Sequence, residues 1–167
     1  MKKLLITLGI AALIATTSYA QRIAIVDVNS LLEGMTEYTT AQSDIDDISA
    51  QWRQDIAKDY DQIKSMYNKY QAEQVLLSDD ARKQREDEIM EYEKAVREKQ
   101  KQRFGAEGDL FRKRQELVRP IQDKVFAAID TYAKERGYDL IFDKGGAAGL
   151  LFATDEFDKT EDIRRKL

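Results

Sequence analysis

The sequence offers few side chains that could carry out chemistry. None of its 167 residues is His or Cys, which removes the common zinc ligands, thiol nucleophiles and Ser-His triads. Carboxylates, Ser, Thr, Lys and Tyr are left for catalysis. The acidic residues are spread along helix-like segments, where a solvated helix face explains them better than two acids facing each other across a cleft. No GxxxxGK phosphate loop occurs, so work driven by ATP is not expected.

Two local features are similar to parts of enzymes. Asp27 ends an apolar strand-like run, where phosphatase nucleophiles and nucleotide-binding acids often occur, but the element that follows is not a parallel strand partner. The glycine-rich segment 145–149 lies between two strand-like runs, and no helix follows directly to receive a phosphate. A hairpin turn is therefore the simpler interpretation. We predict that the protein is not an enzyme and uses no cofactor, metal or nucleotide.

The first twenty residues have the pattern of a cleaved secretory signal. Lys2 and Lys3 form a basic start, residues 4–15 are apolar, and Ser18 and Ala20 supply small side chains where a signal peptidase reads them. The apolar run is shorter than the roughly 20 residues that span a bilayer. The absence of Cys leaves no site for a lipid anchor. We therefore expect cleavage near Ala20 and location in a bacterial periplasm.

The remaining chain is acidic. Without Lys2 and Lys3, 25 basic residues stand against 31 acidic ones, a net charge of about −6. A general binder of nucleic acids or anionic membranes would normally be basic, so no nucleic-acid partner is expected. Because no disulfide can form, the stability of the fold must come from packing or from association.

Short strand-like runs lie near both ends of the predicted mature chain. Residues 22–28 and 138–142 are too short to be stable alone, so we expect them to meet in one sheet, with a further strand over residues 150–153. The edges of such a small sheet are open to pairing, and several copies could close them into a barrel. The residues assigned to this association head are Ile23, Ile25, Val26, Leu140, Ile141, Phe142, Leu150, Leu151 and Phe152.

Between the strands, hydrophobic residues recur at the spacing of helices. We predict a short helix over residues 31–38, a second helix from about Ser43, and a turn at residues 75–80 in which Ser78 caps the next helix. The second helix carries a narrow apolar stripe that is wide enough for one partner helix. The sequence therefore predicts a long antiparallel helical hairpin.

The third helix is predicted to continue to about Arg136, where Gly137 ends it as a left-handed cap. Its apolar stripe is lost around Gly105 and Gly108, which should make the helix locally pliable, and Pro120 should kink it. Gly105, Gly108 and Pro120 are therefore the predicted hinge positions.

Aromatic and methionine side chains on the predicted hairpin are candidates for binding a partner, because they present adaptable apolar area to varied sequences. Packing within the hairpin is the simpler interpretation for any single one of them. The sequence cannot assign their faces without the register between the helices. The candidates are Tyr60, Met66, Tyr67, Tyr70, Met90, Tyr92 and Phe104.

Four segments together resemble a known family: residues 22–28, 77–82, 138–144 and 158–163, the last leading to the C-terminus. In this order, after an export signal, they resemble the Skp/OmpH periplasmic chaperones over essentially the whole mature chain. The resemblance implies an α+β fold in which a coiled-coil arm stands on a small β head. It also implies a homotrimer whose strands share a barrel and whose three arms enclose a cavity for unfolded outer-membrane proteins, without ATP.

With this family in mind, we expect a signal peptide over residues 1–20, a discontinuous trimerisation head over 21–40 and 118–167, and an arm over 41–117. One feature departs from the family. Its members are often strongly basic, which helps to attract acidic clients and lipopolysaccharide, whereas this chain is acidic. Long-range attraction should therefore be weaker, and a lipopolysaccharide or membrane site is not carried over.

Two functions remain open at this point. The first is an ATP-independent holdase that encloses unfolded outer-membrane proteins through many weak contacts and keeps their exposed strands apart. The alternative is an exported structural coiled-coil spacer that binds one fixed partner in the cell envelope.

Overall fold

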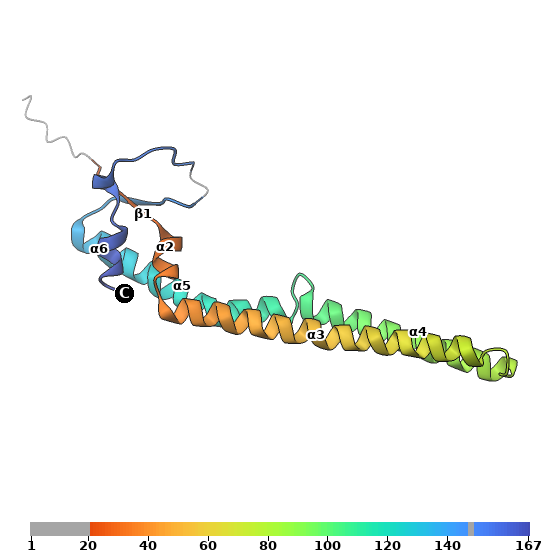
Figure 1. Cartoon of the computed structure of the whole chain (residues 1–167). Coiled ribbons are helices and arrows are strands. Elements are labelled where there is room, and N and C mark those ends of the chain that lie inside the picture. Colours follow the sequence, from red (N-terminus) through yellow and green to blue (C-terminus); the bar gives the residue numbers. More distant parts are fainter. Residues whose placement is uncertain (1–20, 147–148) are drawn as a thin grey trace, which may run out of the picture. The chain divides into compact units, whose positions relative to one another are not determined.

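The computed structural model describes residues 21–146 and 149–167 (Figure 1). The predicted signal peptide and part of the glycine-rich segment lie outside these residues. The described chain is mostly helical, with a long helical hairpin and a small strand pair, which agrees with the predicted fold class at that level. In chain order the elements are β1 (Ile23–Val26), α2 (Val28–Glu33), α3 (Thr36–Glu73), α4 (Asp79–Phe104), α5 (Asp109–Arg136), β2 (Leu140–Asp143), the 3-10 helix η1 (Asp155–Phe157) and α6 (Thr160–Arg164).

The chain divides into two compact units. One unit, here called the strand unit, combines the described residues up to 28 with residues 128–166. The other, here called the hairpin unit, contains residues 29–127 together with the last residue of the chain. Helix α5 contributes residues to both. Each unit is described by itself below.

The two strand-like runs pair in the strand unit, as predicted. β1 and β2 are parallel, with Ile23 opposite Leu140 and Val26 opposite Asp143. Parallel neighbours cannot be joined by a tight turn, and here the helical middle of the chain supplies the long connection. The apolar side chains of β1 are largely buried, whereas β2 remains partly exposed. Within the sheet, β1 is therefore the strand that contributes most to the buried core.

The predicted strand over residues 150–153 is wrong for the described chain, because these residues have no strand conformation. A strand needs a neighbour for its backbone groups. β1 already has β2 on one side and a single bridge from Ile25 to Asp158 on the other. Leu151 and Phe152 are consequently left 99% and 81% exposed.

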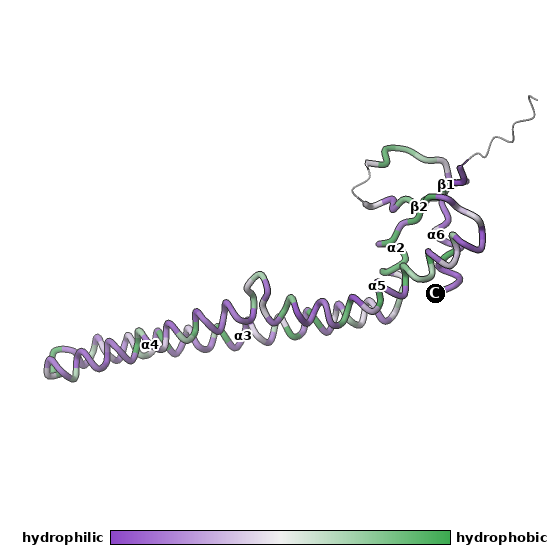
Figure 2. Tube along the Cα trace, turned by 180° about the vertical axis from the view of Figure 1, so that it is seen from behind, coloured by the Kyte–Doolittle hydropathy of each residue, from purple (hydrophilic) through white to green (hydrophobic). Residues whose placement is uncertain are grey.

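The hairpin unit is built on α3, along which α4 and α5 return (Figure 1). An ion pair of 3.2 Å between Lys124 of α5 and Glu37 of α3 joins the inner part of the hairpin. Hydrophilic residues occupy much of the length of both its limbs (Figure 2). The side chains buried along it form one narrow stripe, as predicted: Ala41, Ile45, Ser49, Ile56 and Ile63 on α3, Ile89 and Val96 on α4, and Val118 and Val125 on α5.

The first helices begin earlier than predicted. α2 begins at Val28 and ends at Glu33, and α3 begins at Thr36 rather than near Ser43. Gly34 lies in the turn between the two helices, inside the range predicted for one short helix. The buried side chains of Met35 and Ala41 show why, because packing extends the apolar stripe of α3 by two turns beyond the residues that the spacing alone identified.

The predicted continuous third helix is also wrong, since α4 ends at Phe104 and α5 begins at Asp109. Residues 105–108, here called the interhelical loop, stand out from the hairpin between the two helices (Figure 1). A Cβ atom on Gly105 would lie 2.4 Å from the carbonyl oxygen of Lys101, and one on Gly108 would lie 2.8 Å from that of Gln102. Glycine is therefore required for this close approach of backbone segments.

Other predicted turns and ends are confirmed. The turn before α4 lies where expected, and the Ser78 hydroxyl accepts the N–H of Ala81 as an N-cap. Gly137 has φ +67° and ends α5 as a left-handed cap. Pro120 lies inside α5, and the kink predicted there stays a prediction.

Among the described residues, none of the helices combines the length and apolar character needed to cross a bilayer.

Candidate functional site

Tyrosine hydroxyl groups join the two limbs of the hairpin, which are α3 on one side and the returning helices α4 and α5 on the other; the bonds described here link α3 to α4. Each tyrosine donates a hydrogen bond to a side chain of the opposite limb, so its ring is held at a fixed place between or beside the helices. Such bonds oppose sliding of one helix along the other. The pairs are Tyr60 with Gln100 (3.0 Å), Tyr92 with Asp59 (3.3 Å) and Tyr70 with Glu86.

Carboxylate partners raise the pKa of two tyrosine hydroxyls on the hairpin. A hydrogen bond to Glu93 raises the pKa of Tyr67, and burial adds to the effect. The bond to Glu86 raises the pKa of Tyr70 in the same way. Both hydroxyls, which are already protonated at neutral pH, keep the proton in a hydrogen bond to a carboxylate on α4.

The seven aromatic and Met candidates divide into two groups. Tyr92 and Phe104 pack against the mid-hairpin cluster of Ile56, Ile63 and Val96. Met66 and Tyr70 line a small cavity of about 50 Å³ between α3 and α4. Outward-facing side chains make up the second group: Tyr60 is 46% exposed, Tyr67 40% and Met90 54%. These three offer apolar surface that the hairpin does not use for its own packing, and their binding role stays a prediction.

A set of five residues, here called the clasp, lies around the interhelical loop. Trp52 of α3 is the only Trp in the sequence, and its ring packs edge to face against Phe104 with centres 6.2 Å apart. The guanidinium of Arg103 lies 4.3 Å from the centre of the Trp52 ring and forms an ion pair of 2.8 Å with Asp109. Asp109 also pairs with Arg112. The clasp ties the end of α4, the start of α5 and α3 together.

Sequence reasoning did not find the clasp. Its partners come from three helices, and only the register of the hairpin places Trp52 beside Phe104. One signal was available, because Arg103 and Asp109 flank the Gly-Ala-Glu-Gly segment with opposite charges. That pattern could have indicated a closed loop rather than a pliable helix.

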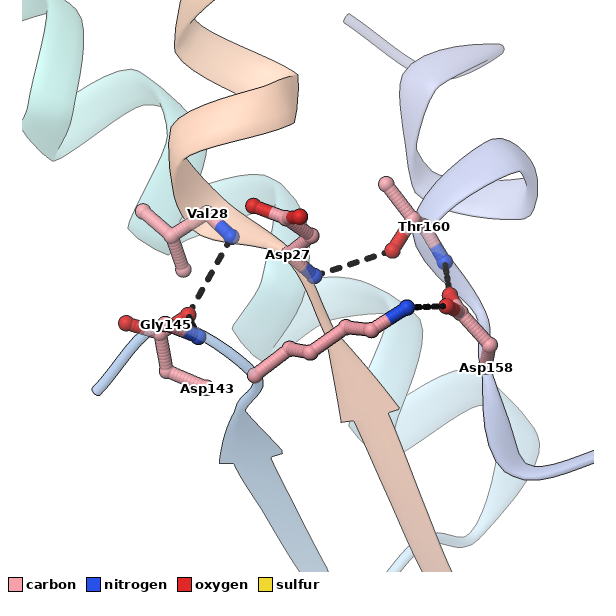
Figure 3. A network of polar contacts seen from close by, with 7 residues as sticks. Asp27, Val28, Asp143, Gly145, Asp158 and Thr160 are labelled. Carbon is pink, nitrogen blue, oxygen red and sulfur yellow. Dashed lines mark hydrogen bonds and ion pairs between the residues drawn. The ribbon is translucent and has the colours of Figure 1, made fainter. Parts of the chain in front are cut away.

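Polar contacts in the strand unit join the ends of its strands (Figure 3). One Asp143 carboxylate oxygen accepts the backbone N–H groups of Val28 at 3.3 Å and Gly145 at 3.1 Å. The Thr160 hydroxyl accepts the backbone N–H of Asp27 at 2.9 Å. These groups satisfy backbone donors at the strand ends, which is a structural role rather than a catalytic arrangement.

The segment before α6 is held by a second carboxylate in the same view (Figure 3). Asp158 accepts the backbone N–H of Thr160 at 2.9 Å and forms an ion pair of 3.3 Å with Lys144. Burial by itself would raise the pKa of Asp158, but the hydrogen bonds from Thr160 and Lys144 outweigh burial and lower it. The carboxylate therefore stays ionised and links β2 to the C-terminal segment.

A buried tyrosine of α5 attaches α6 to α5 within the strand unit. The buried Tyr132 donates a hydrogen bond of 2.9 Å to Asp162 and stacks on Tyr138 with ring centres 5.9 Å apart. Burial, followed by the bond to Asp162, raises the pKa of Tyr132 to about 12. The same bond, assisted by Arg165, lowers the pKa of Asp162.

The residues predicted for the association head differ in how deeply they are buried. Ile25 and Val26 are buried in the strand unit, Ile23 and Ile141 are half-buried, and Leu140 and Phe142 remain exposed. The exposed segment Leu150 to Phe152 is apolar, and Figure 2 shows this stretch in green. A cavity of about 220 Å³ lies between it and β1, lined by Ile25, Lys144, residues 150–155 and Asp158. This segment is therefore an exposed apolar patch next to β1.

The turn between α3 and α4 carries a further apolar feature that sequence reasoning missed. Val75 and Leu76 are largely exposed at this turn. Within the turn, the backbone N–H of Leu76 donates a hydrogen bond of 2.9 Å to the carbonyl oxygen of Glu73.

Nothing in the described part of the chain brings three or more His, Cys, Asp or Glu side chains together in a way that could hold a metal ion.

Comparison with known proteins gives two findings. Residues 22–167 match the model of the family described as outer membrane protein (OmpH-like). The solved structure of a candidate outer membrane chaperone (OmpH-like) from Caulobacter crescentus CB15 has the same fold, with a TM-score of 0.73 over 88% of this chain and 83% of that chain. Their sequences are 11% identical, so this likeness concerns the fold alone. No curated protein matches the sequence.

The family match covers both strands, the hairpin and the C-terminal helix, which are the elements that carry the surfaces described above. The chain therefore belongs to the OmpH-like family.

Proposed function

We propose that this protein is an ATP-independent holdase chaperone of the periplasm, which binds unfolded outer-membrane proteins and prevents their aggregation. Membership of the OmpH-like family and the fold shared with the candidate chaperone from Caulobacter crescentus support the proposal. The observation that carries it is the exposed aromatic and Met surface of the hairpin. Tyr60, Tyr67 and Met90 expose between 40% and 54% of their area, although the hairpin is otherwise densely charged.

The proposed mechanism is containment by many weak contacts. An unfolded barrel strand exposes alternate apolar side chains and unpaired backbone groups, and strands of this kind pair with one another when they are not kept apart. Ring faces held by anchored hydroxyls can contact such strands without requiring one sequence. Several arms acting together increase the residence time without any tight single contact. Release needs no nucleotide, because the client reaches a more stable state when it folds in its membrane.

We further propose that the protein is a homotrimer. Leu151 and Phe152 are almost fully exposed in the single chain, and the outer edge of β2 is open within the described residues. Pairing with further copies would bury these side chains and satisfy the edge, and three copies could close the strands into a shared barrel. In the assembly, residues 21–40 and 118–167 would form the head, and residues 41–117 the arm.

Light scattering tests the proposed function. Several chemically unfolded outer-membrane barrel proteins are diluted into buffer with and without the protein, and aggregation is followed over time. A holdase should suppress scattering for most of them at near-stoichiometric amounts and without ATP. If the protein suppresses the aggregation of none of these barrel proteins, the proposal is contradicted and a structural spacer with one fixed envelope partner is favoured.

A further inference from the structure

The hairpin has a small depression at mid-length, here called the notch. It has a volume of about 280 Å³ and is lined by Arg53 and Ile56 of α3 and by Gln100 and Phe104 of α4. Ile56 is buried and Phe104 packs against the same cluster, so the floor is apolar. Arg53 and Gln100 are exposed and form the rim. The volume is at the lower limit of the roughly 300–1,000 Å³ of small-molecule sites and is large enough for one aromatic side chain.

The rim provides hydrogen-bond donors and a positive charge. Within the residues that the structure describes, the guanidinium of Arg53 makes no ion pair or hydrogen bond. On its own helix, the positions three and four residues away hold Ser49, Ala50, Ile56 and Ala57, none of which is acidic. The opposite rim is a neutral amide. An uncompensated cation beside an apolar floor is complementary to an apolar side chain accompanied by a carboxylate.

An extended chain can present both groups at once. Side chains two residues apart lie on the same face of a strand, roughly 7 Å from each other. When an aromatic side chain fills the notch, an acidic residue two positions away reaches the rim. The Gln100 amide, whose oxygen already accepts a hydrogen bond from Tyr60, can donate to a carbonyl group of the bound chain.

We propose that the notch is a binding site for extended polypeptide segments in which an aromatic residue and an acidic residue are two positions apart. The inference rests on the proposed function and adds a chemical preference to it. Arg53 determines the preference for the acidic residue, while Ile56 and Phe104 receive the ring. An acidic chaperone would thus retain a local site for acidic client segments.

Trp52 makes the proposal directly measurable. It is the only Trp in the sequence, and its ring contacts Phe104, which forms part of the notch floor. Filling the notch should therefore change the emission of Trp52. The probes are two Trp-free peptides of about eight residues in which Phe and Thr alternate, one with Asp two positions from a Phe and the other with Lys at that place.

The native protein should bind the Asp peptide at least threefold more tightly than the Lys peptide at low salt. The Arg53→Gln variant should lose about threefold to fivefold in affinity for the Asp peptide, the size of one exposed ion pair, and keep its affinity for the Lys peptide. High salt should remove the difference in the native protein. Lys64→Gln is the matched control, since Lys64 is exposed on the same helix but does not line the notch.

Equal affinity of Arg53→Gln and the native protein for the Asp peptide would overturn the proposal. So would a Trp52 emission that responds to neither peptide while the protein still suppresses aggregation, because clients would then bind elsewhere. If Trp52 emission instead depends on protein concentration alone, a second copy occupies the notch and the proposal fails. Selective binding of the Asp peptide without any suppression of aggregation would uphold the notch and contradict the proposed function.

Discussion

Tyr132 illustrates how a single buried hydroxyl fixes the C-terminal helix. Its side chain is almost completely buried. Loss of the hydroxyl proton would break the hydrogen bond that Tyr132 donates to Asp162. In the unfolded chain a Tyr ionises near pH 10, whereas in the folded strand unit its pKa is about 12. The stability that this group contributes is therefore complete below pH 10 and is lost as the pH rises towards 12.

This titration gives a prediction for alkaline pH. Tyr132→Phe should cost about 1 kcal/mol at neutral pH through the lost hydrogen bond, and the variant should lose less stability than the native protein between pH 10 and 12. Urea unfolding at fixed protein concentration, measured at pH 8 and pH 11, checks both effects. Equal alkaline losses for the two proteins would show that Tyr132 does not titrate as described.

Asp109 has the central position in the clasp. Its carboxylate is only 16% exposed and pairs with two guanidinium groups, those of Arg103 and Arg112. Asp109→Asn keeps the shape of the side chain and removes the charge. Because both arginines are partly exposed, we expect a modest loss of about 1 kcal/mol, together with a shift in Trp52 emission as Arg103 loses its anchor.

The emission of Trp52 and the urea midpoint measure this effect. Glu116→Gln is a suitable control, since Glu116 forms an exposed ion pair with Lys113 on the surface of α5 and has no part in the clasp. An Asp109→Asn protein with native emission and native midpoint would mean that the clasp does not hold the loop.

At the scale of elements, the two predicted hinge glycines lie in the interhelical loop rather than inside a helix, and their role as a hinge stays a prediction. The glycines are needed for close backbone packing, and the clasp holds both ends of the loop. Bending at this place therefore requires the clasp to open.

Alanine at the two glycines tests this hinge. Gly105→Ala combined with Gly108→Ala places Cβ atoms within 3 Å of backbone oxygens, so the backbone must shift, at a cost of about 1–3 kcal/mol. If the hinge adapts the arm to clients of different size, the double variant should also accept a narrower range of client sizes in the scattering assay. Glu107→Ala changes an exposed side chain of the same loop and should leave stability and client range unaltered. An unchanged range in the double variant would remove the hinge from the mechanism.

The elements also show what a sequence can and cannot reveal. The α3 stripe, the Ser78 cap and the Gly137 end were predictable because each depends on residues within one or two turns. The early start of α3 was not, since it depends on packing of Met35 and Ala41. The notch and the clasp were beyond reach because both depend on the register between limbs, which no local pattern encodes.

The same contrast applies to the strands. Pairing of residues 23–26 with residues 140–143 was predictable from their length and composition. The missing strand at residues 150–153 was not, because a strand forms only where a segment pairs with an edge, and Asp158 rather than this segment bridges to β1.

At the scale of the whole molecule, the apolar segment of the strand unit determines the expected assembly. Leu151 is 99% exposed in the single chain, so replacing it removes no contact within the protomer. Leu151→Ser should therefore leave the helix content unchanged and reduce the mass in solution from three copies to one. Light scattering combined with size-exclusion chromatography at micromolar concentration measures the mass.

Leu76→Ser is the matched control for this prediction. Leu76 is another largely exposed leucine, but it lies at the turn between α3 and α4 and should not contribute to a shared barrel. A native protein that remains a single copy at micromolar concentration would contradict the trimer, and so would a Leu151→Ser variant that keeps the native mass.

The interhelical loop has one more consequence, which concerns how the hairpin can change in length. The four loop residues lie outside the helical path, so the two limbs need not contain equal numbers of residues between the inner end of α3 and the turn at Ser78. Extra residues inserted into the returning limb can be accommodated in this loop without changing the register between α3 and α4. Deleting matched seven-residue blocks from the outer halves of both limbs should accordingly yield a shorter hairpin that still folds. The length of the hairpin is then an adjustable property of this chain.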